Sequence, residues 1–414
     1  MLVVHSIDQL ITVRGRNALR QGQEMNDVEI IENGYLVVEN GKFIALGAGD
    51  GYLEYQNGAS LVCAKGKIVT PGLIDSHTHL VHAGSRENEF QKKLNGVSYL
   101  EILASGGGIL DTVEKTRNAS FEELSQKAKK SLDTMLSYGV TTVEAKSGYG
   151  LDLDNELKQL AVVKELNCNH PIKLVSTFMG AHAIPKEYQG RKEEFIYLLK
   201  KILDEVHKKK LAEFCDVFCE EGVFSLAETE EILQYAAQLG FKLKMHADEI
   251  VPLGGAALAA KLGCTSAEHL MTTTVNDMKL LAEKQVVANV LPLTSFYLDK
   301  GFAKVRLMIE NNCGVAIATD YNPGSSPSEN LQLAMQIASI KTKMTPKEVI
   351  TAVTINGAAS LDRAKSIGSI EIGKEADFVI FDCPNLDYII YHFGVNHVQT
   401  VYINGKEVYK RSLL

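Results

Sequence analysis

The chain has 414 residues, of which 45% are hydrophobic and 23% are charged, and its formal net charge is −8. A chain of this length can bury a large core, and it exceeds one ordinary small domain. The mild acidity argues against general nucleic-acid binding, which requires clustered basic side chains. Residues 1–5 carry no basic stretch leading into an apolar run, and no apolar segment of about 18 residues occurs. We therefore expect neither export nor a membrane span.

Seven cysteines are scattered along the sequence without a paired CxxC spacing. An odd number of dispersed cysteines is typical of reduced, mostly buried thiols rather than of a disulfide framework. Cys215 and Cys219 have no second pair to complete a metal site, so we interpret them as structural. Together with the absence of a leader, this pattern predicts a cytoplasmic protein.

Both ends of the chain predict β structure. In residues 35–47, two apolar runs flank Asn40-Gly41, a dipeptide typical of tight hairpin turns. Residues 401–409 repeat this pattern, and residues 377–381 supply another strand. Because neither end holds enough strands for a stable sheet, we expect the two ends to combine. Two separate hairpin modules are the alternative.

The middle of the chain alternates short apolar strands with helical stretches, which predicts a parallel sheet with helices outside it. One helix is predicted over residues 121–137, where Ser120 and Glu123 have capping-box spacing. Eight strand–helix units in roughly 250 residues predict a closed (β/α)8 barrel. An open doubly wound sheet is the alternative, but no GxGxxG or phosphate-loop fingerprint supports it. The predicted strands cover residues 68–79, 140–146, 172–182, 215–223, 243–246, 265–269, 286–292 and 315–320.

The predicted fold class is therefore α/β. Residues 69–365 form a barrel of the TIM type, and residues 1–68 and 366–414 form a small, discontinuous, β-sandwich-like domain. The glycine-rich stretch over residues 106–108 lacks the lysine and the strand-to-helix setting of a nucleotide-binding loop. We interpret it as a flexible or tightly turning loop of the active site.

Histidines gather at the C-terminal ends of the predicted strands, where barrels of this kind place their catalytic groups. His77 and His79 are two residues apart, so both rings face the same side of the first strand. Five of the eleven histidines fall at such ends, which favours a metal site over separate hydrogen-bonded core histidines. Four later strands also end in a residue that can bind metal, namely His182, His246, His269 and Asp320.

Imidazole nitrogens together with one carboxylate suit zinc or ferrous iron. We assign the ligands as His77, His79, His246 and Asp320. His269 is either a distant ligand or a proton carrier behind the ligands. A metal ion held this way lowers the pKa of water toward neutrality, which favours attack on an amide carbon. The proton acceptor is one of Asp320, His269 and Glu249, a carboxylate three residues past His246.

Two further residues are candidates for substrate binding. Arg86 follows the first predicted strand, where its guanidinium could hold a carboxylate in a two-pronged contact. A surface salt bridge is the alternative. Tyr149 lies between Gly148 and Gly150, and glycines let the backbone approach a ligand closely. An ordinary turn is the alternative there.

The motifs resemble those of the amidohydrolase superfamily. Its signature is similar to Pro71-Gly72-Leu73-Ile74-Asp75-x-His77-x-His79, although Ser76 stands where proline is frequent. Residues 373–379 resemble the superfamily's C-terminal β domain. More specific stretches resemble the imidazolonepropionase family, and this resemblance covers essentially the whole chain. These stretches are residues 77–81, 84–86, 104–109, 146–151, 177–182, 246–249, 319–326 and 391–397.

The resemblance implies metal-dependent hydrolysis of the cyclic amide C–N bond of 4-imidazolone-5-propanoate to N-formimidoyl-L-glutamate, the third step of histidine degradation. It also implies one zinc or iron ion per chain and a homodimer. By matching motif, Arg86 holds the propanoate carboxylate, and Tyr149, His182 and Glu249 contact the ring or its product. The product-glutamate end is lined by Asn322, Gly324 and Ser325.

Some superfamily members carry a lysine on strand four that becomes carbamylated and bridges two metal ions. Residues 218–222 contain no lysine, so a single ion is expected here. Two rival functions remain. One is another amidohydrolase, such as a base deaminase or a deacetylase, which Arg86 and the Tyr149 loop disfavour. The other is a non-catalytic scaffold, which the complete ligand set disfavours.

Overall fold

The structure is a computed structural model that describes residues 1–15, 18–96 and 107–412. Its centre is an eight-stranded parallel sheet in the order β13-β12-β11-β10-β9-β8-β7-β6, which confirms the predicted (β/α)8 architecture. The strands of this sheet are β6 (Leu73–Asp75), β7 (Val140–Lys146), β8 (Lys173–Ala181), β9 (Phe214–Cys219), β10 (Lys242–Ala247), β11 (Ser266–His269), β12 (Val287–Val290) and β13 (Val315–Ile317).

The barrel closes between the segments that follow β6 and β13. The backbone N–H of Asp320 donates to His77 O at 3.0 Å, and the N–H of His79 donates to Tyr321 O at 2.9 Å. These are bonds between neighbouring parallel segments, and Thr78 and Tyr321 form a parallel bridge there. Three of the four assigned metal ligands therefore lie along the closing seam.

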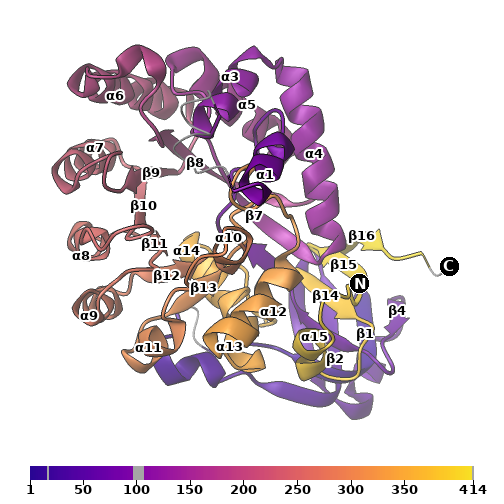
Figure 1. Ribbon diagram of the computed structural model, residues 1–414. Helices are drawn as coiled ribbons and strands as arrows, with labels where there is room; N and C mark the ends of the chain where they lie inside the picture. Colours follow the sequence, from indigo (N-terminus) through magenta and orange to yellow (C-terminus); the bar gives the residue numbers. More distant parts are fainter. Residues whose placement is uncertain (16–17, 97–106, 413–414) are drawn as a thin grey trace.

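Helices cover the outside of the barrel, and Figure 1 shows α6 to α9 stacked beside β8 to β11. The predicted helix over residues 121–137 is confirmed as α4, and Ser120 and Glu123 form its capping box. Within the described part of the chain, no helix has the length and apolar character needed to cross a membrane. The α-helices are α1 (Glu87–Leu94), α3 (Ile109–Asn118), α4 (Phe121–Ser137), α5 (Leu153–Asn169), α6 (Lys192–Lys209), α7 (Leu226–Gln238), α8 (Gly255–Leu262), α9 (Val275–Glu283), α10 (Pro292–Tyr297), α11 (Val305–Glu310), α12 (Leu331–Thr342), α13 (Pro346–Ala352), α14 (Ile355–Ser360) and α15 (Leu386–Tyr391). The 3-10 helices are η1 (Gly22–Asn26), η2 (Gly49–Tyr55) and η3 (Lys186–Tyr188).

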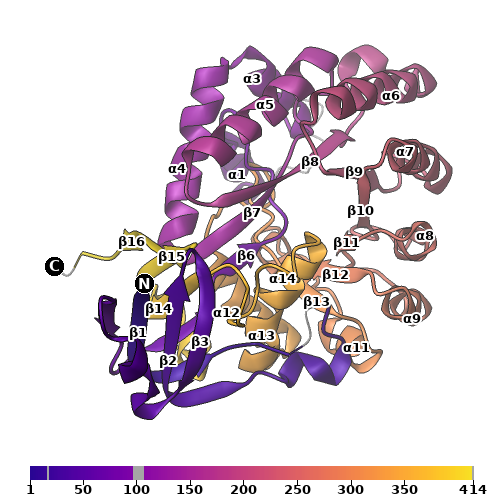
Figure 2. The ribbon, with the colours of Figure 1, turned by 180° about the vertical axis from the view of Figure 1, so that it is seen from behind.

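Strands from both ends of the chain form a second sheet, here called the end sheet, in the order β16-β15-β14-β5-β1-β2-β3, with β4 also paired to β1. The two ends thus combine in one sheet rather than in two separate modules. Asn40 and Gly41 have φ values of 51° and 77° and form the predicted turn between β2 and β3. Figure 2 shows this sheet beside the barrel, with the N-terminus on it. Its strands are β1 (Leu2–Ile11), β2 (Ile30–Glu39), β3 (Lys42–Ala48), β4 (Ser60–Cys63), β5 (Ile68–Pro71), β14 (Phe378–Phe381), β15 (Val398–Ile403) and β16 (Lys406–Lys410).

The first predicted barrel strand, residues 68–79, is wrong as a single element. It consists of β5 in the end sheet and β6 in the barrel, separated by Gly72. The N–H of Gly72 donates to Asp377 O at 2.9 Å, and a Cβ at this position would lie 2.2 Å from Thr141 Oγ1. The chain passes from one sheet to the other at a point where any side chain would collide. Pro71-Gly72, a dipeptide typical of turns, marks this junction between the two apolar runs in the sequence.

The glycine-rich loop predicted over residues 106–108 falls partly outside the described residues, as does most of the 104–109 motif. Within the described part, Gly108 immediately precedes α3 with a φ of 78°, which is the left-handed region that favours glycine.

Candidate metal centre and active site

Four histidines and one aspartate converge at the C-terminal mouth of the barrel. Their donor atoms form two overlapping groups, and within each group all lie within 4.8 Å of one another. Asp320 Oδ1 lies 3.3 Å from His77 Nε2 and 3.5 Å from His79 Nε2. The structure therefore brings the four predicted ligands and His269 into one cluster. The two groups are His77 with His246 and His269, and His77 with His79 and Asp320.

The unpaired atoms of this cluster fit a metal ion. His77 Nε2, His246 Nε2 and His269 Nδ1 are buried and make no aligned hydrogen bond with any described residue. Buried polar atoms are normally paired, because leaving one unpaired costs about 1–3 kcal/mol. Several unpaired nitrogens that surround a carboxylate form the donor set that zinc and iron prefer.

Burial sets the charge states of the cluster. It raises the pKa of Asp320 to about 7, and the charge of His269 opposes that shift. Burial also lowers the pKa of His246 to about 3, against the effect of Asp216. The imidazole is therefore neutral, which is the form that binds metal. A cation beside Asp320 would stabilise its carboxylate form.

Two of the clustered residues have strained backbones. His269 and Asp320 have φ values of 70° and 53°, although neither is a glycine. Such conformations cost of order 1–3 kcal/mol and persist only where the surroundings hold them. Thr294 Oγ1 donates to Asp320 Oδ2 at 2.6 Å and so fixes the carboxylate.

Arg86 lies over the loop that follows β13. Its Nε donates to Glu89 Oε2 at 3.0 Å, and Glu89 Oε1 accepts from Gly108 N at 2.7 Å. A Cβ at Gly324 would lie 2.1 Å from Arg86 Nη1, so the guanidinium rests directly against the bare backbone there. Arg86 and Glu89 form a salt bridge, but it is largely buried, with side chains only 11% and 9% exposed, unlike the surface salt bridge considered above. Among the residues described, Arg86 Nη1 and Nη2 have no hydrogen-bond partner, and a guanidinium can present these two groups together as a two-pronged donor.

The Tyr149 loop is held by two side chains of α5. Glu156 Oε1 accepts the backbone N–H groups of Gly148, Gly150 and Leu151 at 3.2, 2.9 and 2.9 Å. Gln159 Oε1 accepts that of Tyr149 at 3.1 Å. Every N–H of this four-residue loop is thus bound by a buried side chain, and Tyr149 is only 3% exposed. The loop is fixed more rigidly than an ordinary turn.

His182 and Glu249 flank the cluster. The His182 ring stacks on His79 with centroids 4.8 Å apart, and its Nδ1 lies 3.0 Å from Gly148 O, so this contact does not use its Nε2. Glu249 Oε2 lies 3.7 Å from His269 Nε2. Burial, followed by the charge of Glu220, raises the pKa of Glu249 to about 7. Such a carboxylate can exchange a proton near neutrality.

Asn322 organises the loop that carries Gly324. Its Oδ1 accepts from the N–H groups of Gly324 and Ser325, both at 2.8 Å, and its Nδ2 donates to Asp320 O at 2.6 Å. The amide of Asn322 is therefore engaged inside the loop. Through these bonds it links the Arg86 contact to the metal-binding aspartate.

Sequence reasoning missed the carboxylates behind the histidines. Glu268 Oε2 lies 2.8 Å from His77 Nδ1, and Asp216 Oδ2 lies 3.0 Å from His246 Nδ1. Asp248, in the 246–249 motif, instead caps α8 by accepting backbone N–H groups at 2.9–3.1 Å. The sequence held one signal for these carboxylates. Lys244 lies two residues before His246, so both face the same side of β10, and a lysine buried beside the histidine needs a carboxylate partner.

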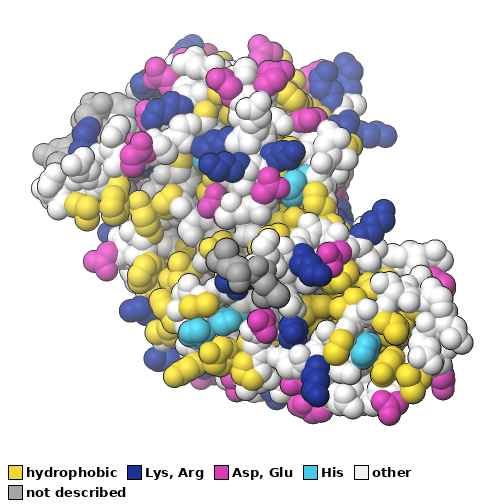
Figure 3. Space-filling view, turned by 90° about the vertical axis from the view of Figure 1, so that its right-hand side faces the viewer, with side chains coloured by type: hydrophobic (Ala, Val, Ile, Leu, Met, Phe, Trp, Pro, Cys, Tyr) yellow, Lys and Arg dark blue, Asp and Glu magenta, His cyan; other side chains and the backbone are white. Residues whose placement is uncertain are grey.

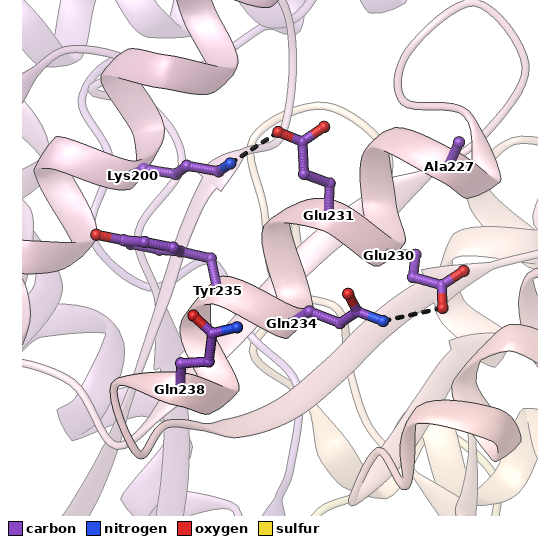
Figure 4. A pocket seen from close by; sticks show the side chains of 7 residues that line it. All are labelled: Lys200, Ala227, Glu230, Glu231, Gln234, Tyr235 and Gln238. Carbon is purple, nitrogen blue, oxygen red and sulfur yellow. Dashed lines mark hydrogen bonds and ion pairs between the residues drawn. The ribbon is translucent and has the colours of Figure 1, made fainter.

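The surface of the molecule is unlike the cluster. Figure 3 shows acidic and basic side chains interspersed over one face. A depression of about 470 Å³ lies between α6 and α7, where Lys200 pairs with Glu231 at 2.7 Å (Figure 4). Its lining is polar and solvated, and it contains none of the clustered histidines. Most of residues 391–397 also lie on the outside, where Tyr391 is 81% exposed, but His397 is buried.

The barrel, its histidine cluster and the end sheet together define an amidohydrolase. The family model described as "Amidohydrolase family" matches residues 68–408. The imidazolonepropionase of Alkaliphilus oremlandii is 57% identical over 412 residues, which cover 99% of this chain and 98% of that protein. That of Fusobacterium nucleatum is 56% identical over 412 residues, covering 99% of both chains. The chain belongs to the amidohydrolase family and, within it, to the imidazolonepropionases.

A solved structure supports the fold alone. An adenosine deaminase from Xanthomonas campestris with bound zinc superposes with a TM-score of 0.72 at 19% identity, over 98% of this chain and 92% of that one. At such low identity its substrate does not transfer to this chain.

Proposed function

We propose that this chain hydrolyses the cyclic amide bond of 4-imidazolone-5-propanoate to N-formimidoyl-L-glutamate. One observation carries the proposal: a nearly buried guanidinium, Arg86, lies over the loop that begins at the metal-site residue Asp320. The substrate has the matching parts, a carboxylate at one end and an amide carbon at the other. A base deaminase acts on a neutral ring, which offers no carboxylate to Nη1 and Nη2 of Arg86.

We propose that His77, His79, His246 and Asp320 hold one zinc or iron ion, with His269 as a further ligand or a proton carrier. When bound, the ion would polarise water and the amide carbonyl. The buried lysines nearest the cluster, Lys146 and Lys244, are both paired to carboxylates, at 2.8 and 3.1 Å. Because the Nζ of each lysine is already engaged by a carboxylate, neither is placed to bridge two metal ions, which supports a single ion.

The substrate would be oriented by charge at one end and by stacking at the other. Arg86 Nη1 and Nη2 would donate to the two propanoate oxygens, as in other guanidinium–carboxylate pairs. Tyr149 and His182, with ring centroids 5.3 Å apart, would contact the imidazolone ring, with Glu249 nearby. Asn322, Gly324 and Ser325 would line the glutamate end of the product.

The reaction needs one proton moved from water to nitrogen. The water oxygen bonds to the amide carbon, the ring C–N bond breaks, and the departing nitrogen takes up a proton. Asp320, His269 and Glu249 are the groups placed to accept the water proton and return it. The pKa of about 7 for Glu249 suits this exchange.

Turnover of freshly prepared imidazolone propanoate tests the proposal. We expect loss of its ultraviolet absorption together with formation of N-formimidoyl-L-glutamate. His246→Ala and a chelator-stripped sample should both be inactive, and only the stripped sample should recover when metal is returned. Release of ammonia from a purine or pyrimidine base, with imidazolone propanoate left intact, would contradict the proposal.

We further propose a cytoplasmic homodimer whose chain divides into a barrel (residues 69–365) and a small β domain (residues 1–68 and 366–414). The membership of β5 in the end sheet supports moving the first boundary to Gly72. Sedimentation equilibrium tests the dimer, and limited proteolysis tests the division.

A further inference from the structure

A chain of alternating charges, here called the ionic arc, is buried inside the barrel. Lys146 Nζ lies 2.8 Å from Asp216 Oδ2 and 2.9 Å from Glu144 Oε2. Lys244 Nζ lies 3.1 Å from Glu144 Oε1 and 3.7 Å from Glu268 Oε1. All five side chains are 0% exposed. An isolated buried charge is very costly, so each of these charges needs a partner of opposite sign. An arrangement this costly to bury indicates that it supports another part of the molecule.

Each end of the ionic arc lies against a metal-site histidine. Asp216 Oδ2 lies 3.0 Å from His246 Nδ1, and Asp216 Oδ1 also accepts the backbone N–H of His246 at 3.1 Å. At the other end, Glu268 Oε2 accepts from His77 Nδ1 at 2.8 Å. The arc therefore joins His246 to His77. At His77 the hydrogen bond from Nδ1 to the carboxylate leaves Nε2 with the free electron pair facing the cluster, whereas at His246 the carboxylate lies close to Nδ1 without an aligned hydrogen bond and holds the residue through its backbone N–H.

At the His77 end of the arc, both carboxylate oxygens of Glu268 face hydrogen-bond donors. Glu268 Oε2 accepts from Asn289 Nδ2 at 2.7 Å as well as from His77, and Glu268 Oε1 accepts from Ser266 Oγ and faces Lys244. A glutamine at this position would turn an N–H₂ group toward one of these donors. The site therefore requires a carboxylate, although this side chain is not itself a metal ligand.

The backbone holds the ionic arc in place. Glu144 and Lys146 are two residues apart on β7, and Lys244 and His246 are two apart on β10, so each pair faces the barrel interior. The strand register places Lys244 beside Asp216, and His246 beside Glu268. Groups on rigid, hydrogen-bonded strands hold their geometry better than groups on loops.

We propose that Lys146 and Lys244 are positioning residues, which hold the ionic arc together so that His77 and His246 present Nε2 to one shared metal ion. Neither lysine touches a histidine, so each acts through Asp216, Glu144 or Glu268. This inference rests on the proposed metal site but not on the identity of the substrate.

The consequence is coupling across the barrel. Loss of Lys146 leaves Asp216 and Glu144 without their shared cation, and Glu144 also anchors Lys244. A substitution at the His246 end should therefore disturb the His77 end as well. Changes at Lys146 and Glu268 should combine non-additively, since both act on one connected unit.

The experiment measures metal affinity rather than turnover. Full-length protein is loaded with Zn²⁺ and titrated with a chromophoric chelator, and a parallel Co²⁺ sample reports ligand geometry by its visible absorption. The variants are Lys146→Met and Glu268→Gln. The control is Glu348→Gln, a buried carboxylate that pairs with Arg306 at 3.0 Å and lies on α13, away from the cluster. Circular dichroism confirms that each variant is folded.

We expect Lys146→Met and Glu268→Gln to weaken Zn²⁺ binding by about 10- to 100-fold, the usual effect of losing a group behind a metal ligand. The Co²⁺ spectrum should also change, whereas Glu348→Gln should alter unfolding only. Unchanged affinity and spectrum in Lys146→Met would overturn the inference, whatever Glu268→Gln does, and if Lys146→Met does not fold, Lys244→Met replaces it as the deciding variant. A wild-type chain that retains no Zn²⁺ also overturns it. Failure to turn over imidazolone propanoate, with these metal effects present, overturns only the proposed function.

Discussion

A single methyl group should test how Arg86 is positioned. In Gly324→Ala the new Cβ would lie 2.1 Å from Arg86 Nη1 and 2.6 Å from its Cζ. Atoms in van der Waals contact lie about 3.5 Å apart, so the guanidinium must move by about 1 Å or more. A displacement of that size at a group that orients substrate costs roughly 100-fold in rate. Because Gly324 does not have a positive φ, alanine fits its backbone and the effect should come from the collision alone.

The assay is kcat/KM for imidazolone propanoate in a double-mutant cycle. Arg86→Ala alone should lower kcat/KM by about 2–4 kcal/mol in free-energy terms, roughly 30- to 900-fold, because a bound carboxylate loses its charged partner. In that background Gly324→Ala should add almost nothing. Gly301→Ala, where nothing lies within 4 Å of the added Cβ, is the matched control. If Gly324→Ala has the same effect with and without Arg86, the collision is not its cause.

Three other outcomes are expected. His246→Ala should contain less than one metal ion per chain by elemental analysis, and a full complement would remove this residue from the ligand set. Glu156→Ala should lower the free energy of unfolding in urea by about 3 kcal/mol, because three backbone N–H groups lose their acceptor; Glu156→Gln retains an acceptor oxygen and should lose less, so equal losses would refute this reasoning. Finally, kcat/KM should rise as pH increases through 7, because the pKa of Glu249 is about 7 and only its charged form accepts a proton. Glu249→Gln should lose that rise, and a wild-type profile that is flat from about pH 5.5 to 8 would argue against the proton role.

Much of the barrel was predictable because its signals are local. The strand over residues 140–146 and the helix over residues 121–137 have the predicted bounds, since apolar runs and a capping box mark them directly. The metal-site residues were predictable for a related reason. Parallel strands in a barrel end on the same side, so histidines at strand ends must meet there.

The features that the sequence did not predict depend on contacts between segments far apart in the chain. The ionic arc pairs Lys146 with Asp216, 70 residues away, and nothing local to either residue indicates the partner. The charged residues of the ionic arc lie in strands that were predicted from the apolar residues around them. Those apolar residues do not indicate how the charges pair. The break at Gly72 has a local turn signal in Pro71-Gly72, but the change of sheet there depends on the distant residues Thr141 and Asp377.

The break at Gly72 also bears on how the protein is made. Strand β5, which precedes β6 and the proposed metal ligands His77 and His79, pairs with β14, so that Ile68 lies beside Phe381 and Pro71 beside Phe378. A ribosome synthesises these partners some 300 residues apart, at about 5–20 residues per second. For many seconds the segment before the first metal ligands has an unpaired edge, and the site cannot be anchored on that side. The nascent chain should therefore acquire its metal only after most of the C-terminal strands have emerged.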